Sequence, residues 1–395
     1  MSFEIALSGI NAINSQLDTI SNNIANSGTY GFKYSRSNFA SMYAGTQATG
    51  AEVSSVTQSI DIGGGVLTTG RSMDASIQGR GFFVSKSSSG ESFYSRVGIF
   101  SPDKEGYVVD SFGRKVQGYA AVAGSTALGA LGDLKVSSGQ IPAQASTKLQ
   151  YVANMSADWT VPTVATFDKS EPQSFNSSMV SVVYDSLGAQ HSVTQYFVKT
   201  NTGEVTVHYT FDGADLGTTN TLRFDTTGQL TAPTTPVTVA LGTPTGATAM
   251  SLSIDYTGTT QFAGEATNTT NAADGYASGT MIGVQITDDG SVMAQYSNGL
   301  KQRVGTLALA TFPDEGALTQ VSDTSWVASN ASGTALYFTP GTGMAGTLTP
   351  GSLEQSNVDM TEQLVDLMSA QRNYQANTKV ITAQNEMMQT LMQAL

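Results

Sequence analysis

The residue types that most often carry out catalysis are scarce in this chain. It has no cysteine and only two histidines, His191 and His208. His208 falls on the polar side of an alternating strand pattern, where a solvated side chain is far more common than a general base. A Ser-His-Asp triad requires three side chains brought together, and two isolated histidines give no basis for one. We therefore predict no catalytic residue and no enzymatic activity.

Motifs that bind ions or cofactors are equally weak in the sequence. Asp288-Asp289-Gly290 is typical of a tight turn and lacks the further ligands that a calcium loop requires. Gly63-Gly64-Gly65 precedes neither a helix nor the Lys-Ser or Lys-Thr pair of a phosphate-binding loop. The sequence thus predicts no metal site and no cofactor. One alternative, a secreted carbohydrate-active β protein, would need clustered acids and exposed aromatic residues on one face, and neither is convincing here.

The strongest pattern is an apolar seam at each end of the chain. Near the N-terminus, residues three and four positions apart form the series Phe3, Ala6, Ile10, Ile13, Leu17, Ile20 and Ile24. The same spacing recurs at the other end in Leu364, Leu367, Gln371, Tyr374, Thr378, Ile381, Asn385, Met388, Met392 and Leu395. It predicts one helix at each end with a narrow apolar stripe. Because so narrow a stripe makes no core alone, we expect the helices to pack on each other or on neighbouring copies of the protein.

Polar residues interrupt these seams. Gln371, Thr378 and Asn385 replace residues that would stabilise a seam better, and such polar positions fix the register between helices at a cost in stability. Tyr374 fits ordinary packing and a contact between subunits equally well. The run Asn22-Asn23-Ile24-Ala25-Asn26 has the composition of a frayed helix end. Together with Gly31-Phe32 and the matching C-terminus, however, we interpret it as a site of hydrogen bonds between subunits.

Composition narrows the class of protein further. Only 12% of the 395 residues are charged, and the net charge of −13 disfavours binding to nucleic acid or to an anionic membrane. No stretch approaches the roughly 18 apolar residues of a membrane span. The first 30 residues lack the basic start and continuous apolar run of a cleavable signal peptide. With no cysteine to oxidise, the chain fits an extracellular protein exported without a cleaved signal.

Between the two ends the sequence is rich in strand patterns. Short runs at 81–84, 93–97 and 106–110 are separated by turn residues, and strand patterns resume from Val284 to Trp326. Two further runs alternate strictly between apolar and polar residues, at 205–211 and 250–256, which predicts strands with one buried and one wet face. The segment 264–279 contains few apolar residues and is interpreted as a linker.

These patterns predict a mainly β fold with helical coiled-coil termini and nested, discontinuous β domains, the second inserted in the first. The expected boundaries are 1–28 and 357–395 for the terminal helices, 29–72 for a connecting arm, 73–141 and 283–356 for an inner β domain, and 142–282 for an inserted outer β domain.

Several ordered motifs resemble the family of bacterial flagellar rod and hook proteins. At the N-terminus these are Leu17-Asp18-Thr19-Ile20-Ser21-Asn22-Asn23-Ile24-Ala25-Asn26 and Gly31-Phe32-Lys33. Further along come Ile77-Gln78-Gly79-Arg80-Gly81-Phe82-Phe83, Arg96-Val97-Gly98-Ile99-Phe100, Tyr296-Ser297-Asn298-Gly299 and Gln371-Arg372-Asn373-Tyr374-Gln375-Ala376-Asn377. Ser27-Gly28-Thr29-Tyr30 departs from the usual family text.

Within this family, the length of the chain and its inserted domain favour a hook subunit. The alternatives are another axial component, such as a distal rod or hook-associated junction protein. The resemblance implies an extracellular homopolymer, a flexible tube that joins rod to filament and transmits torque. It also implies partners: the flagellar rod, the hook cap, the hook-filament junction proteins and the type III export apparatus.

From the seams and motifs together we predict a self-assembly interface. Its residues are Phe3, Ile10, Ile13, Leu17, Ile20, Asn22, Asn23, Ile24, Asn26, Gly31, Phe32, Leu364, Leu367, Gln371, Tyr374, Asn377, Ile381, Met388 and Leu395.

Overall fold

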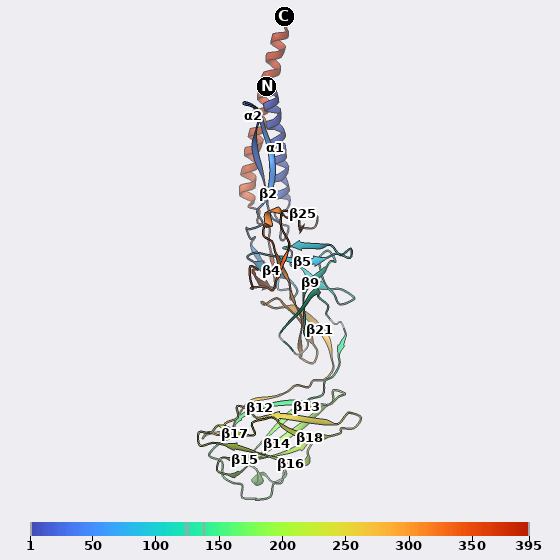
Figure 1. The fold of residues 1–395 in the computed structure, drawn as a ribbon, viewed down its shortest axis with the longest axis vertical. Helices are drawn as coiled ribbons and strands as arrows, with labels where there is room; N and C mark the ends of the chain where they lie inside the picture. Colours follow the sequence, from blue (N-terminus) through green and yellow to red (C-terminus); the bar gives the residue numbers. More distant parts are fainter. Residues whose placement is uncertain (1, 123–124, 126, 137–138, 394–395) are drawn as a thin grey trace. The chain divides into compact units, whose positions relative to one another are not determined.

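The computed structural model of the chain describes residues 2–122, 125, 127–136 and 139–393, which form two compact units (Figure 1). The first unit combines Met1–Ser138, Gly283–Gln295 and Lys301–Leu395, and the second combines Gly139–Ile282 and Tyr296–Leu300. Both units consist mainly of strands, and the first also contains a helix from each end of the chain. The predicted fold class, mainly β with helical ends, is confirmed.

Two long helices run along each other in the first unit, α1 (Ser2–Ala25) and α2 (Met360–Gln393) (Figure 1). The start of α2 is fixed by Asp359, whose carboxylate accepts the backbone N–H groups of Thr361 and Glu362 at 2.8 and 3.2 Å. This cap satisfies two of the donors that a helix start leaves free. With 34 residues, α2 is longer than α1, which has 24.

A long β-hairpin follows α1, where the sequence had predicted a connecting arm with only short extended runs. Its strands β1 (Ser35–Ala44) and β2 (Gln47–Gln58) pair antiparallel and lie against α1 (Figure 1). Thr19 and Ser37 share a hydrogen bond of 2.9 Å, and the Ala51 N–H donates to the Ser8 hydroxyl at 3.3 Å. The helix supplies a packing surface that a local reading of the sequence does not reveal.

The rest of the first unit is a β structure whose main sheet has the order β21-β22-β23-β9-β5-β6-β26-β25. These strands are β21 (Gly279–Ile286), β22 (Ser291–Tyr296), β23 (Lys301–Leu307), β9 (Lys115–Ala121), β5 (Phe82–Lys86), β6 (Ser92–Ser95), β26 (Ser325–Val327) and β25 (Thr319–Val321). Smaller strands complete the unit: β3 (Val66–Thr68), β4 (Ala75–Gln78), β7 (Phe100–Pro102), β8 (Val108–Asp110), β10 (Leu128–Asp133), β24 (Leu309–Thr311), β27 (Leu336–Phe338), β28 (Thr347–Pro350) and β29 (Ser352–Glu354), with a 3-10 turn at Glu315–Ala317.

Aromatic residues fill the core of this β structure. Phe82 packs on Trp326 with ring centroids 5.4 Å apart, and Tyr94 meets Phe312 edge to face at 4.8 Å. The indole N–H of Trp326 donates to the side chain of Gln58 at 2.7 Å, so the core is joined to the end of the hairpin. The buried aromatic rings stabilise this β structure.

The second unit contains two sheets packed around one core. The five-stranded sheet has the order β13 (Ser177–Tyr184), β14 (Gln190–Asn201), β15 (Glu204–Phe211), β16 (Ala214–Phe224) and β17 (Leu230–Ala232). The four-stranded sheet has the order β18 (Val237–Gly242), β19 (Met250–Asp255), β12 (Lys148–Asn154) and β20 (Thr267–Ala273). A short strand β11 (Gln140–Ile141) and a 3-10 turn at Pro172–Ser174 complete it.

The alternating strands predicted at 205–211 and 250–256 are confirmed. Val207, Tyr209 and Leu252 are fully buried between the two sheets. The buried tyrosine hydroxyls are paired inside this core: those of Tyr209 and Tyr256 lie 2.8 Å apart, and that of Tyr256 donates to Gln195 at 2.6 Å. Such a network is stable because no member lacks a partner there.

The predicted linker at 264–279 is wrong for seven of its sixteen residues. Residues Thr267–Ala273 form β20, which pairs antiparallel with β12, with Leu149 opposite Ala273. The strand lies at the edge of its sheet and buries little side-chain surface. Backbone pairing therefore holds it in place, and its Thr and Asn side chains give no apolar signal.

Candidate functional site: the terminal helices and their groove

The predicted seams meet along part of the two helices. Ile13, Ile20 and Ala370 are buried against one another, with Leu17, Ile24 and Leu367 partly buried around them. Asn23 bonds to Gln363 at one end, and Gly9 lies beside Asn377 further along, so the helices are antiparallel. On α2, Gln363 and Ala370 supply the buried contacts, while the predicted neighbours Leu364 and Gln371 are exposed. The stripe that faces α1 is therefore rotated by about one residue from the predicted seam.

Asn23 uses its amide inside the chain, where we had expected contacts between subunits. It is 1% exposed and donates to Gln363 at 2.9 Å and to the Ser35 carbonyl at 2.8 Å. Its oxygen accepts the Ser35 N–H at 2.9 Å. One side chain thus joins α1, the start of the hairpin and α2. Asn26 donates to Asn22 and accepts from Thr29, so both bond within their own turn.

The Gly31-Phe32 motif lies inside the first unit, in the segment that follows α1. Gly31 has a φ of +68°, and a Cβ there would come within 3.0 Å of the backbone of Arg96 and Val97. Only glycine meets both conditions at low cost. Its N–H donates to the Glu354 carbonyl at 2.8 Å, and Phe32 is buried beside it.

A buried ionic cluster lies next to this motif. The Lys33 ammonium lies 2.7 Å from one carboxylate oxygen of Glu354, and Arg96 lies 3.3 Å from the other. All three side chains are at most 3% exposed. Lys33 also donates to the Ile62 carbonyl at 2.6 Å. Burial lowers the pKa of Lys33, and the neighbouring Glu354 carboxylate opposes that shift.

The remaining predicted interface residues lie partly or wholly on the surface. Ile10, Asn377 and Ile381 are half-buried, whereas Phe3, Leu364, Gln371, Tyr374 and Met388 are exposed. Leu395 lies outside the described residues. Phe3, Leu364, Tyr374 and Met388 are 38 to 62% exposed in the described chain.

The far end of α2 extends past α1. The register set by Asn23 with Gln363 and Gly9 with Asn377 places the start of α1 near Gln384. Every described residue from 385 to 393 is exposed. Four apolar side chains on this segment are 61 to 77% exposed: Met387, Met388, Leu391 and Met392. We call residues 385–393 the α2 overhang.

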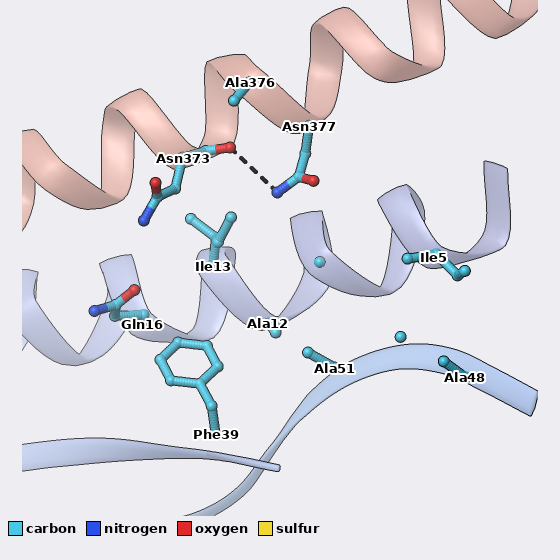
Figure 2. A pocket seen from close by; sticks show the side chains of 12 residues that line it. Ile5, Ala12, Ile13, Gln16, Phe39, Ala48, Ala51, Asn373, Ala376 and Asn377 are labelled. Atoms are coloured by element: carbon cyan, nitrogen blue, oxygen red, sulfur yellow. Dashed lines mark hydrogen bonds between the residues drawn. The ribbon is translucent and has the colours of Figure 1, made fainter. Parts of the chain in front are cut away.

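A groove of about 730 Å³ opens where α1, α2 and the hairpin meet (Figure 2). Its apolar walls include Ile5, Ile13 and Phe39, and the amides of Asn373 and Asn377 lie along the α2 side. Its twelve lining residues carry no charge. We call it the helix-hairpin groove.

Two glycines allow this groove to form. A Cβ on Gly50 would lie 1.9 Å from the hydroxyl of Ser8, and Gly50 has a φ of +133°. The hairpin can therefore approach α1 closely only with glycine there. A Cβ on Gly9 would lie 3.1 Å from the amide nitrogen of Asn377, so α2 also approaches α1 at a glycine.

Within the described residues, no group of three or more His, Asp or Glu side chains is placed to hold a metal ion. None of the helices described is both long and apolar enough to cross a bilayer. The surface instead combines exposed apolar side chains with an uncharged groove, an arrangement suited to contact with another protein surface.

Reasoning from the sequence missed several of these residues. Lys33 and Arg96 both stand in motifs that the sequence made conspicuous, but their shared partner Glu354 lies more than 250 positions away from either. Gln363 and Ala370 were passed over because an amide and a small residue give a weak apolar signal. A scan for charged residues in otherwise apolar or glycine-rich motifs would have singled out Lys33 and Arg96.

Four family models match the chain in consecutive order. They are the flagella basal body rod protein model at 3–33, the flagellar hook protein FlgE/F/G D1 domain at 76–155, the flagellar basal body protein FlaE D2 domain at 154–276 and the flagellar basal body rod FlgEFG protein C-terminal model at 349–394. The paired terminal helices and the β units between them thus define an axial protein of the bacterial flagellum.

Full-length relatives identify the family more closely. The flagellar hook protein FlgE of Salmonella typhimurium is 38% identical, with 99% of each chain covered, and that of Escherichia coli is 37% identical with the same coverage. The Treponema pallidum protein of the same name is 32% identical over 98% of this chain and 97% of its own. The chain belongs to the flagellar hook protein FlgE family, which confirms the resemblance found in the sequence. It is a structural hook protein of the flagellar motility apparatus.

A solved structure has a related fold. The crystal structure of the Helicobacter pylori flagellar hook protein FlgE2 superposes with a TM-score of 0.55 and covers 73% of this chain and all of its own. The sequence identity is 13%, so this likeness concerns the fold alone.

Proposed function

We propose that copies of this chain assemble outside the cell into the tubular, flexible hook that joins the flagellar rod to the filament and transmits torque. The observation that carries the proposal is the uncovered apolar surface of the terminal helices. On the part of α2 paired with α1, Leu364, Val365 and Met368 are 47 to 52% exposed. On α1, Phe3, Ile5 and Leu7 are 40 to 43% exposed.

Apolar surface of this kind is costly in water for a protein that acts alone. Neighbouring copies would bury it, and the gain would repeat at every added subunit. An apolar cluster of only three buried residues leaves the helix pair weakly held in a single copy, so assembly would also stabilise the helices. This supports terminal helices that pack against other copies in the polymer.

The same proposal includes the neighbours of the hook. We propose contacts with the flagellar rod at one end, with the hook cap during growth and with the hook-filament junction proteins at the other end. Export through the flagellar type III apparatus would deliver the subunits. The domain division into terminal helices 1–28 and 357–395, arm 29–72, inner domain 73–141 with 283–356 and outer domain 142–282 is retained as part of this proposal.

Electron microscopy of the purified chain after nucleated assembly tests the homopolymer. We expect tubes from the unaltered chain, and their loss in Val365→Asp combined with Met368→Asp, since two carboxylates would be buried without partners at each contact. The monomer should keep its melting temperature because both side chains are about half exposed. Leu187→Asp, at an apolar residue of the second unit that is 66% exposed, is the control. Persistent monomers of the unaltered chain would contradict the proposal.

A further inference from the structure

The α2 overhang and the helix-hairpin groove are complementary in chemistry. Residues 387–393 of the overhang read Met-Met-Gln-Thr-Leu-Met-Gln and carry no charge, and Glu386 before them is its one charged side chain. The groove has no charged lining residue. Methionine side chains are flexible and fill irregular apolar cavities well. The volume of about 730 Å³ lies within the range of about 300–1,000 Å³ that is usual for pockets that enclose a ligand.

The overhang cannot fill the groove of its own chain. Asn377 lines the groove, and Met388 lies eleven residues further along the same continuous helix. At 1.5 Å per residue this places Met388 about 16 Å away along the axis. A helix without a break does not fold back on itself, so an overhang that enters a groove must come from another copy.

We propose that the α2 overhang of one copy inserts its Met388, Leu391 and Met392 side chains into the helix-hairpin groove of a second copy. This inference rests on the proposed homopolymer and names one of its contacts. The two surfaces are different parts of the chain, so the contact is head-to-tail and leaves a free groove and a free overhang at the two ends of any chain of copies. Contacts of this kind produce open helical polymers.

Amide side chains on both surfaces could orient the contact through hydrogen bonds. Gln16 lines the groove together with Asn373 and Asn377, and Gln389 and Gln393 alternate with the apolar residues of the overhang. Amide side chains both donate and accept hydrogen bonds. A neutral polar rim around an apolar centre is the usual composition of an interface between proteins. It would also make this contact insensitive to salt, since no charge pair takes part.

Disulfide cross-linking tests the contact directly because the natural chain has no cysteine. Ala48 lies on the exposed rim of the groove, and Met392 lies on the overhang at 77% exposure. Tubes assembled from the Ala48→Cys, Met392→Cys double variant should give, on oxidation, a ladder of covalent dimers, trimers and longer species. Every copy would contribute its overhang to one neighbour and its groove to another. Each single variant should give dimers at most.

The matched control places the second cysteine on the paired part of α2. Met368 is 49% exposed and apolar, like the overhang residues, but lies in the other half of the helix. The Ala48→Cys, Met368→Cys variant should form tubes without a ladder, because a disulfide requires Cα atoms within about 7 Å. If tubes form and the two pairs cross-link equally, or neither does, the overhang contact is wrong while the homopolymer stands. If the unaltered chain forms no tubes, the homopolymer fails and this contact fails with it.

A charge pair gives an independent measurement. Met388→Lys places a cation on the overhang and Ala51→Asp an anion in the groove, and each alone should slow nucleated assembly at least about tenfold, since a single charge would be buried without a partner. The double variant should recover much of that rate because each cation now meets an anion. Additive losses in the double variant would overturn the proposal.

Discussion

At the scale of single residues, the most consequential group is Glu354, which holds two buried cations. Its carboxylate contacts Lys33 with one oxygen and Arg96 with the other, and the Gly64 N–H donates to it at 3.0 Å. Lys33 comes from the segment after α1 and Arg96 from the β structure, while Glu354 itself ends β29, the strand before α2. One side chain therefore joins the segment after α1, the β structure and the strand before α2.

The first prediction compares two substitutions in this cluster. Glu354→Gln removes the only negative charge of the three and leaves two buried cations without a counter-ion, so we expect a loss of about 3–5 kcal/mol in unfolding free energy. Lys33→Met leaves the pair of Glu354 with Arg96 intact and should cost clearly less. Chemical denaturation of the full chain measures both. An equal cost for the two variants would show that packing, not charge, dominates the site.

His191 forms a second charged site, in the second unit. Its ring nitrogens lie 2.6 Å from Asp212 and 3.3 Å from Asp185, and the ring stacks on Phe211. Hydrogen bonding to Asp212 is the main cause that raises the pKa of His191, while the pKa values of both aspartates are lowered. Nearby, Lys169 bonds to the carbonyl of Gly213.

The second prediction follows from the direction of these shifts. A histidine whose pKa is raised on folding stabilises the fold fully below its unfolded pKa of about 6.5, and this contribution is lost as pH rises through the folded pKa. The aspartates stay ionised throughout that window. The melting transition of the second unit should therefore fall from pH 6 to pH 8, and by less in His191→Gln. Calorimetry across this range measures the effect.

His208 provides the control for that experiment. Burial lowers its pKa, so its effect on stability has the opposite sign and appears as pH falls. We expect the melting temperature of the His208→Gln variant still to fall as the pH rises above 6.5. If His191→Gln and His208→Gln gave the same pH profile, the imidazolium of His191 would have no special role.

At the scale of elements, sequence patterns predicted the helices and strands whose buried faces follow from local residue spacing. Both helices and the strictly alternating strands follow from side-chain period alone, because residues such as Val207 and Ile20 mark the buried face directly. The hairpin of β1 and β2 was not predicted, because its side chains pack against α1, which is not adjacent in a local pattern. Strand β20 was not predicted because backbone pairing, and not an apolar face, holds it in place. The pairing of Lys33 with Glu354 joins positions far apart in the chain, which no local pattern encodes.

The third prediction concerns the stability of the helix pair. The apolar cluster between α1 and α2 contains three buried residues, whereas the core cluster of the second unit contains eighteen among the described residues. Local opening is easiest where few apolar contacts must be broken. Amide exchange in the free chain should be fastest in the overhang, slower in the paired part of α2 and slowest in β14 and β15.

A substitution separates this ranking from simple fraying. Ile20→Ala removes a side chain that is 5% exposed from the seam, which typically costs about 2–5 kcal/mol in a full core and less in one this thin. It should speed exchange in both helices and leave the second unit unchanged. Protection of the overhang equal to that of β15 in the unaltered chain would contradict the prediction.

At the scale of the whole molecule, the chain enters and leaves the second unit at adjacent positions. Ile141 of β11 lies opposite Gly279 of β21 in an antiparallel pair, and such neighbours lie about 5 Å apart. The whole core cluster of the second unit lies between residues 149 and 256. Its strands are therefore carried by a single excursion of the chain that a two-residue turn could replace.

The fourth prediction is that this excursion is dispensable for assembly. Deleting residues 142–278 and joining Ile141 to Gly279 through Asn-Gly, the sequence preferred in two-residue hairpins, keeps α1, α2, the hairpin, the Glu354 cluster and the helix-hairpin groove. Since the proposed contacts lie on those elements, nucleated assembly should still give tubes, with altered stiffness or curvature. Electron microscopy of the deletion variant measures this, and residues 139–282 alone, which lack all terminal contacts, should remain monomeric.

The deletion also discriminates between two ways of building the polymer. If the shortened chain keeps its helical signal and melts as one unit but forms no tubes, then an essential contact lies on the second unit, and the exposed apolar surface of the helices is insufficient. If tubes form and the Ala48, Met392 cysteine pair still cross-links them, the terminal helices carry the assembly by themselves. The second unit would then affect the stiffness or curvature of the tube, while contacts of the first unit hold the tube together.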